Sequence, residues 1–239
     1  MSGAMEEVSI SFNVTEPRGG WLLEEETVPE PPLHGEIIAL LAEILQHHAK
    51  SSGRSVLIAR DLACRWDPKD ARVGTDPDIV WLEPAPEEGL ELSSLRIWEP
   101  GRQPPRIAIE VVSKNTPEKD YLQGPLRGAR LGTQELWILD PRAYGPDVTG
   151  GPFPIQVWER TPAAGNVAAH MSRIYAGPGP GYSPQLDAWV VMGEEGQVRV
   201  ASDADGADLW PTRAEAVEKA ARARVAELEA KLRAAGIEP

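Results

Sequence analysis

The sequence predicts an α/β domain in which helices flank a central, largely buried sheet. An amphipathic helix comes first, because apolar residues recur at helical spacing between Ile37 and Leu45. Later segments are nearly continuous in Ile, Val, Leu and Trp, as expected of strands covered on both faces. A stretch long enough for a crossover helix lies between Val112 and Glu135. A length of 239 residues suffices for one substantial core and an appendage.

The individual elements follow from these patterns. The first helix is expected over residues 34–50, with one buried stripe and with Glu36, Glu43 and His47 on another side. Pro125 can occupy the first turn of the crossover helix but not its interior. The strands are expected at residues 55–66, 78–82, 106–112, 135–140 and 155–160, with short ones around 173–176 and 198–200.

The two ends of the chain differ from this body, which we place at residues 33–208. Residues 1–32 contain the run VPEPP and predict an irregular arm. Residues 211–236 begin with Pro and Thr, end with Gly, and predict an exposed helix. Glu and Lys or Arg alternate along this helix at i, i+4 spacing, starting with Glu215 and Lys219. A seam at four-three spacing predicts that it docks on the body or pairs with a second copy as a short coiled coil; the seam consists of Ala221, Val225, Leu228, Leu232 and Ala235.

Charge and composition limit the classes of function. The formal net charge of −13 repels a polyanion at long range, so any binding of DNA has to be local or bridged by a metal ion. The single Cys64 cannot form an intramolecular disulfide and no leader pattern opens the sequence, so we expect a cytoplasmic protein. The longest apolar stretch, Ile37–Leu45, is too short to cross a bilayer, and no membrane association is expected.

Two acidic residues adjoin strand-like sequence and could carry chemistry. Asp78 opens the segment DIVWL, and Glu110 lies within RIAIEVV. A carboxylate in such apolar surroundings is costly to bury without a partner, and a divalent cation is one such partner. Adjacent strands could bring both carboxylates to one Mg²⁺ or Mn²⁺ ion. In the alternative interpretation, Asp78 caps the loop before its strand and Glu110 pairs with an Arg or Lys.

Other kinds of site find little support. The four histidines, His34, His47, His48 and His170, do not have the spacing of zinc ligands. The sequence has neither a glycine-rich phosphate-binding loop nor a Gly-x-Ser-x-Gly elbow. The eight Trp residues are scattered over the strands, which is typical of core packing rather than of a platform for stacking bases.

An ordered set of short motifs resembles the Uma-two family of the PD-(D/E)XK nuclease superfamily. The motifs are His34 near a helix start, Pro77-Asp78, Glu110-Val111-Val112-Ser113, Lys119-Asp120, and Trp137-Ile138-Leu139-Asp140-Pro141. With the hairpin segments and Glu-rich helix that follow, the resemblance covers residues 31–236. It implies a restriction-endonuclease-like mixed sheet flanked by helices, with Asp78 and Glu110 as metal ligands. It also makes Glu36 an accessory acid, although a solvated helix residue is an equal interpretation.

The sequence departs from the family at its lysine. In the superfamily a Lys near the second acid steadies the attacking water or the charge on phosphorus, and the family position for it falls on Gly124. Three basic residues are candidates to replace it: Lys114, Lys119 and Arg127. Arg cannot serve as a base, though it can stabilise phosphate charge. Lys114, four residues after Glu110, is the prediction, with a solvated turn lysine as the alternative.

These residues predict a divalent-metal-dependent endonuclease that hydrolyses DNA phosphodiester bonds. Asp78 and Glu110 would hold Mg²⁺ or Mn²⁺, and Lys114 would assist. The alternative is a catalytically inactive protein of the same fold that acts as a binding or structural module. One fold carries many activities, so the fold does not separate the two hypotheses.

Overall fold

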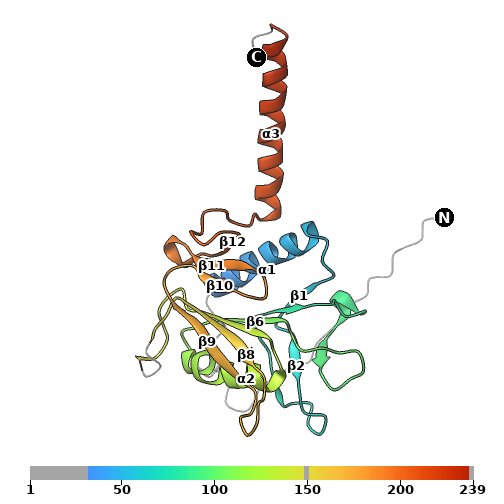
Figure 1. Cartoon of the computed structure of the whole chain (residues 1–239), viewed down its shortest axis with the longest axis vertical. Coiled ribbons are helices and arrows are strands. Elements are labelled where there is room, and N and C mark those ends of the chain that lie inside the picture. The colour runs from blue at the N-terminus through green and yellow to red at the C-terminus, as the bar shows by residue number, and fades with distance from the viewer. Residues whose placement is uncertain (1–31, 148–150, 237–239) are drawn as a thin grey trace, which may run out of the picture.

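A six-stranded mixed sheet organises the computed structural model, which describes residues 32–147 and 151–236 (Figure 1). Only the neighbours β6 and β7 run parallel, and all other adjacent pairs are antiparallel. This arrangement confirms the predicted α/β class with a mixed sheet. In spatial order the strands are β1 (Leu57–Arg60), β4 (Ile79–Leu82), β6 (Ile107–Val111), β7 (Glu135–Leu139), β8 (Ile155–Thr161) and β9 (His170–Gly177).

One face of the sheet is covered by helix α1 (Pro32–Ser51) and a small antiparallel sheet. That sheet has the order β10 (Gly181–Ser183), β11 (Ala188–Met192) and β12 (Val198–Ala201), with the 3-10 turn η5 (Glu194–Gly196) between the last two. Buried side chains of α1, the central strands, β11 and β12 form one hydrophobic cluster. The first helix is therefore the amphipathic element that the sequence predicted, beginning two residues earlier.

The opposite face is covered by helix α2 (Gly124–Leu131) and a second small sheet. Its strands are β3 (Gly74–Thr75), β2 (Ala63–Arg65) and β5 (Ser94–Arg96), and the 3-10 turn η2 (Gly89–Glu91) precedes β5. A π-helical turn, η3 (Lys119–Gln123), leads directly into α2, and Pro125 occupies the first turn of α2 as predicted. Gly132 ends α2 with φ 89°, a conformation that favours glycine.

Alternation along the strands decides which face each side chain reaches. Ile107, Ile109 and Val111 belong to the α1 cluster, whereas Ala108 and Val112 pack with Tyr121 beside α2. Glu110 lies between Ile109 and Val111 in a strand of period two, so it points to the α2 side.

The predicted strand 55–66 is wrong in one respect. It is two strands in different sheets, β1 and β2. The backbone turns at Asp61, which has φ 51°, and the sequence pattern does not reveal this break because buried apolar residues lie on both sides of it.

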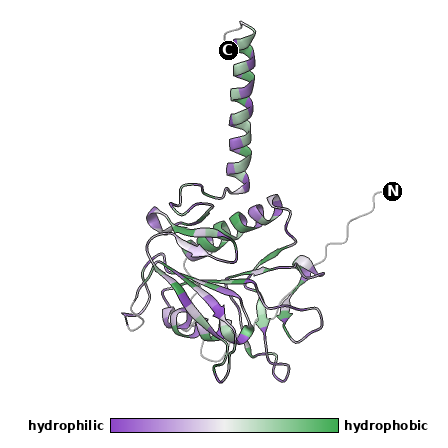
Figure 2. Ribbon diagram, viewed as in Figure 1, coloured by the Kyte–Doolittle hydropathy of each residue, from purple (hydrophilic) through white to green (hydrophobic). Residues whose placement is uncertain are grey.

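Helix α3 (Arg213–Ala234) projects away from the body (Figure 1). Thr212 caps it, accepting a bond from the Glu215 amide while the Glu215 side chain accepts from the Thr212 amide. Glu215 also pairs with Arg199, not with Lys219 as the spacing suggested. The helix buries no residue, and Figure 2 shows apolar and polar positions interleaved along it. The predicted docking of its seam on the body is wrong, because Val225 and Leu228 are exposed.

Two further findings concern the predicted ends and membrane association. All but the last residue of the predicted N-terminal arm lies outside the described residues, and that last residue, Pro32, begins α1. In residues 32–147 and 151–236, no helix combines the length and apolar character needed to span a membrane.

Candidate active site

Asp78 and Glu110 face each other across two neighbouring strands. Strands β4 and β6 are antiparallel with Ile79 opposite Ile109, which puts Asp78, just before β4, opposite Glu110. The Asp78 carboxylate accepts a hydrogen bond of 2.6 Å from the Val111 amide. The predicted convergence of the two acids therefore agrees with the strand register, while their role as metal ligands stays a prediction.

Glu110 is a deeply buried acid, with 4% of its surface exposed. Burial raises its pKa well above the ordinary value, and the negative charges of Asp78 and Asp120 raise it further. The charge of Lys119 and a hydrogen bond from the Asp78 backbone act in the opposite direction. The fold therefore holds an acid where its ionised form is unfavourable, which is a recurrent property of functional sites.

Asp78 is less buried, with 17% of its side chain exposed. Burial raises its pKa, as does the charge of Asp61, whereas the Val111 hydrogen bond and the charges of His34 and Lys119 lower it. The alternative interpretation expected Asp78 to cap the loop before its strand. Instead, its carboxylate accepts a hydrogen bond from the Val111 amide on the neighbouring strand. The two acids thus form one interacting pair.

His34 joins this pair from the first turn of α1. Its Nε2 atom lies 2.8 Å from the carbonyl oxygen of Val111 and 3.8 Å from Oδ2 of Asp78. The sequence identified His34 only through a motif, because a lone His on a helix carries no signal of its own. Glu36, two residues further along, is exposed.

The turn η3 supplies the basic residue that acts on both acids. Lys119 lowers the pKa of Asp78 and of Glu110, and its Nζ lies 4.0 Å from Oδ1 of the buried Asp120. Lys114 is exposed and follows β6 in a loop. Among the three candidate basic residues, Lys119 is the one that lowers the pKa of both acids, while the role of Lys114 stays a prediction. The alternative interpretation expected Glu110 to pair with an Arg or Lys. The favourable effect of the Lys119 charge on ionised Glu110 agrees with that interpretation as well as with a metal site.

The donor set suits a hard cation with few protein ligands. Within the part of the chain that the structure describes, no three His, Cys, Asp or Glu side chains are grouped to hold a metal ion. Mg²⁺ commonly takes one or two carboxylates and completes its octahedron with water and substrate phosphate. Two opposed carboxylates, one of them buried and destabilised by the other, fit that requirement.

Comparison with known families decides the relationship of this chain. The Uma2 model, described as "Putative restriction endonuclease", matches residues 16–148, more than half of the 239 residues. The chain belongs to the Uma2 family. The match includes Asp78, Glu110 and the turn η3.

Other comparisons are more distant. A crystal structure described as a putative nuclease belonging to DUF820 from Anabaena variabilis is similar at 17% identity and a TM-score of 0.40. The similarity covers 72% of this chain and 84% of that chain, and at this level it carries no argument. No curated protein matches the chain.

Gly124, where the family resemblance leads to the expectation of a lysine, is buried. Gly124 begins α2, and a Cβ built on it would lie 3.7 Å from Ile138, an ordinary contact distance. Ile138 pairs with Glu110 in the parallel register of β6 and β7. Gly124 therefore lies on the side of the sheet where the acids are, but it has no side chain to reach them. Arg127, one turn later, bonds to Gln123.

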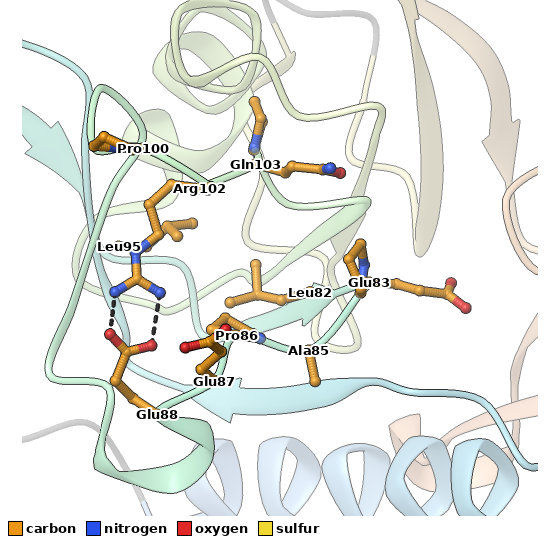
Figure 3. Close-up of a pocket in the computed structure, with 13 residues that line it drawn as sticks. Leu82, Glu83, Ala85, Pro86, Glu87, Glu88, Leu95, Pro100, Arg102 and Gln103 are labelled. Atoms are coloured by element: carbon orange, nitrogen blue, oxygen red, sulfur yellow. Dashed lines mark hydrogen bonds and ion pairs between the residues drawn. The ribbon is translucent and has the colours of Figure 1, made fainter.

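The pocket in Figure 3 is a different feature of this Uma2 chain. It has a volume of about 260 Å³ and begins at Leu82, the end of β4 opposite to Asp78. Arg102 crosses it and forms a bidentate ion pair with Glu88. The basic side chain is thus already neutralised, and the pocket does not adjoin the paired acids.

A smaller hollow lies at the ends of β6 and β7, next to His34. Its volume is about 30 Å³, and its lining includes His34, Val111, Lys114, Arg142 and Tyr144. Two exposed basic side chains, Lys114 and Arg142, therefore flank the place where β6 and β7 end.

Proposed function

We propose that this Uma2 protein is an endonuclease that hydrolyses DNA phosphodiester bonds with the help of Mg²⁺ or Mn²⁺. The observation that carries the proposal is the opposition of Asp78 and Glu110 across β4 and β6, with Lys119 acting on both. A divalent cation held by the two carboxylates would supply positive charge at the phosphate and a water molecule of lowered pKa.

The residues around the two carboxylates have separate tasks in this proposal. Lys119 provides a positive charge beside the phosphate, where negative charge develops during the reaction. The Asp120 carboxylate, 4.0 Å from the Lys119 ammonium, would offset part of its charge when no phosphate is bound. His34 keeps the end of β6 fixed through the Val111 carbonyl. Lys114 keeps its predicted role as an alternative source of the positive charge, which mutation can separate from that of Lys119.

Local basic residues would let an acidic protein approach DNA. The chain carries a formal charge of −13, so contacts with phosphate have to come from a few exposed Lys and Arg side chains. Lys114 and Arg142 line the hollow at the ends of β6 and β7, from where they would contact phosphates on either side of the cleaved bond. Binding through two such contacts would weaken as salt concentration rises.

The test is cleavage of plasmid and single-stranded DNA with Mg²⁺, with Mn²⁺ and with a chelator. We expect metal-dependent cleavage by the wild type and a loss of about a hundredfold or more in Asp78→Asn and Lys119→Ala. Lys114→Ala is the matched lysine control, with weaker DNA binding and a smaller loss. Equal losses of cleavage rate in the two lysine variants would show that Lys114 takes part in the reaction. An unchanged rate in Lys119→Ala would remove Lys119 from it.

The competing function is that of a non-catalytic binding or structural module. Gly124 in place of the family lysine favours it. Absence of cleavage by the wild type over all metals and substrates, together with retained DNA binding, would establish this alternative.

We further propose that α3 joins two copies of the chain as a short parallel coiled coil. Val225, Leu228 and Leu232 are exposed and follow the alternating three-residue and four-residue spacing of a coiled-coil seam. In a parallel pair, Arg224 of one helix would lie beside Glu229 of the other, which gives opposite charges at the flanking positions.

Light scattering on the full chain tests this pairing. We expect the mass of a dimer for the wild type and of a monomer for Leu228→Glu. Arg224→Glu should weaken the dimer, and the double variant with Glu229→Arg should restore it. A monomeric wild type would refute the pairing without affecting the nuclease proposal.

A further inference from the structure

Tyr121, the residue after Asp120, is buried and hydrogen-bonded, although it belongs to the turn η3. Tyr121 is 4% exposed and packs with Ala108, Val112 and Ile138. Its hydroxyl donates a hydrogen bond of 2.8 Å to Oδ2 of Asp140. The hydroxyl also accepts a bond of 3.0 Å from the Phe153 amide. Both bonding capacities of this hydroxyl are used, so the ring has one well-defined position.

Asp140 is itself fixed by the backbone around it. It is 1% exposed, and its two oxygens accept bonds from the amides of Tyr144 (2.8 Å) and Gly145 (2.7 Å). It follows β7, which pairs with β6, the strand that carries Glu110. A continuous set of bonds and strand pairs therefore links Tyr121 to the strand of Glu110.

Two glycines pack closely against the Tyr121 ring. A Cβ built on Gly145 would lie 2.2 Å from the ring, and one built on Gly151 would lie 3.1 Å from it. At Gly145 a larger residue would displace Tyr121, because real Cβ atoms do not come that close to carbon. The surrounding loop thus leaves room for the aromatic side chain through its glycines.

The turn that carries Tyr121 needs such support. The π-helical geometry of Lys119–Gln123 is rare and is found frequently at functional sites. The Lys119 side chain is 40% exposed and has one ion-pair partner in the described residues, at 4.0 Å, so its own contacts hold it weakly. Tyr121, two residues further along the same turn, is buried and doubly bonded.

We propose that Tyr121 and Asp140 are positioning residues, which brace the turn η3 so that Lys119 and Asp120 stay beside Asp78 and Glu110. This inference deepens the proposed nuclease function and rests on the same site. Neither residue touches the reacting atoms; each acts through the placement of Lys119.

The affinity for Mn²⁺ tests the positioning role, because a purely structural role of Tyr121 would leave this affinity unchanged. The Lys119 charge opposes a cation at the two carboxylates, so Lys119→Ala should tighten Mn²⁺ binding by about tenfold or more, as expected for one unit charge a few ångströms from a doubly charged ion. Tyr121→Phe keeps the ring and removes the hydroxyl. We expect it to tighten Mn²⁺ binding in the same direction, and to have no further effect in a Lys119→Ala background.

The control is Tyr182→Phe in β10, which removes an exposed residue's hydroxyl bonded to Asp187 and should leave Mn²⁺ binding unchanged. Wild-type Mn²⁺ affinity in Tyr121→Phe would overturn the inference even if its melting temperature fell. Additive effects of the Tyr121 and Lys119 variants would overturn it too, since the brace would then act by another route.

A second measurement separates this inference from the proposed function. If the wild type binds no Mn²⁺, the proposed metal-dependent function is refuted. The positioning role of Tyr121 is then tested by measuring, without metal, the free energy of unfolding of the wild type, the two single variants and the double variant. Coupling between Tyr121→Phe and Lys119→Ala in the free energy of unfolding supports it, and independent effects refute it.

Discussion

The paired acids and helix α3 both concentrate charged residues, but the two regions neutralise their charges differently. On α3, Glu218, Glu227 and Glu229 each form an ion pair one turn away, in full contact with solvent. At the site, Glu110 is buried and is opposed by two other acids. Exposed pairs on a helix contribute little, whereas a buried charge with incomplete compensation is costly. The difference shows that burial, and not the number of charges, decides where a substitution has a large effect.

The largest effect is expected at Glu110. Glu110→Gln keeps the shape of the side chain and removes its charge, so metal-dependent cleavage should fall by about a hundredfold or more. Without metal the variant should melt a few degrees higher than the wild type, about what 1 kcal/mol gives in a chain of this size. Cleavage assays and calorimetry with a chelator measure both. Glu218→Gln on α3 is the matched control and should change neither.

A second prediction concerns Gly124, the position at which the family resemblance leads to the expectation of a lysine. Gly124 is helical (φ −50°, ψ −54°), and a side chain there meets only ordinary contacts. Gly124→Lys should therefore fold, and in a Lys119→Ala background it should raise cleavage by about tenfold or more through restored charge. Gly124→Ala controls for the gain in helix propensity. No rescue by Lys would mean that Lys119 does not act from an equivalent position.

The third prediction is a dependence of stability on pH. Because the pKa of Glu110 is higher in the folded protein than in the unfolded chain, folding takes up a proton. The destabilisation by ionised Glu110 is fully present above the folded pKa and disappears as the pH falls toward the unfolded value of about 4.3. The melting temperatures of Glu110→Gln and the wild type, measured without metal, should differ most at mildly alkaline pH and converge under acid. A constant difference would show that Glu110 is not the group responsible.

The smallest effect is expected on α3. Arg222→Ala removes an i, i+4 partner of Glu218 and should cost about 0.3 kcal/mol. Urea unfolding monitored by circular dichroism can place an upper bound on this change. A loss above about 1 kcal/mol would indicate that Arg222 has a partner in a second copy of the chain, since an exposed pair does not contribute that much.

Much of the site could be predicted because it depends on local sequence. Asp78 and Glu110 adjoin apolar strands, and a carboxylate in such a context is conspicuous. Lys119 could not be separated from Lys114 in this way. Both follow the same strand within nine residues, and no local pattern shows that the charge of Lys119, in the π-helical turn, lowers the pKa of both acids. Tyr121 gave no signal, because a buried Tyr with satisfied bonds looks like core in a sequence.

The sequence by itself determined the elements: the amphipathic first helix, the buried strands, the crossover helix with Pro125 in its first turn, and the capped helix after Thr212. Each is set by periodicity or by capping, which act within a few residues. Tertiary structure alone decided the division of residues 55–66 between two sheets, the exposure of the α3 seam, and the effect of the Lys119 charge on the two acids. These features depend on contacts between residues far apart in the chain, whose free energies no local pattern records.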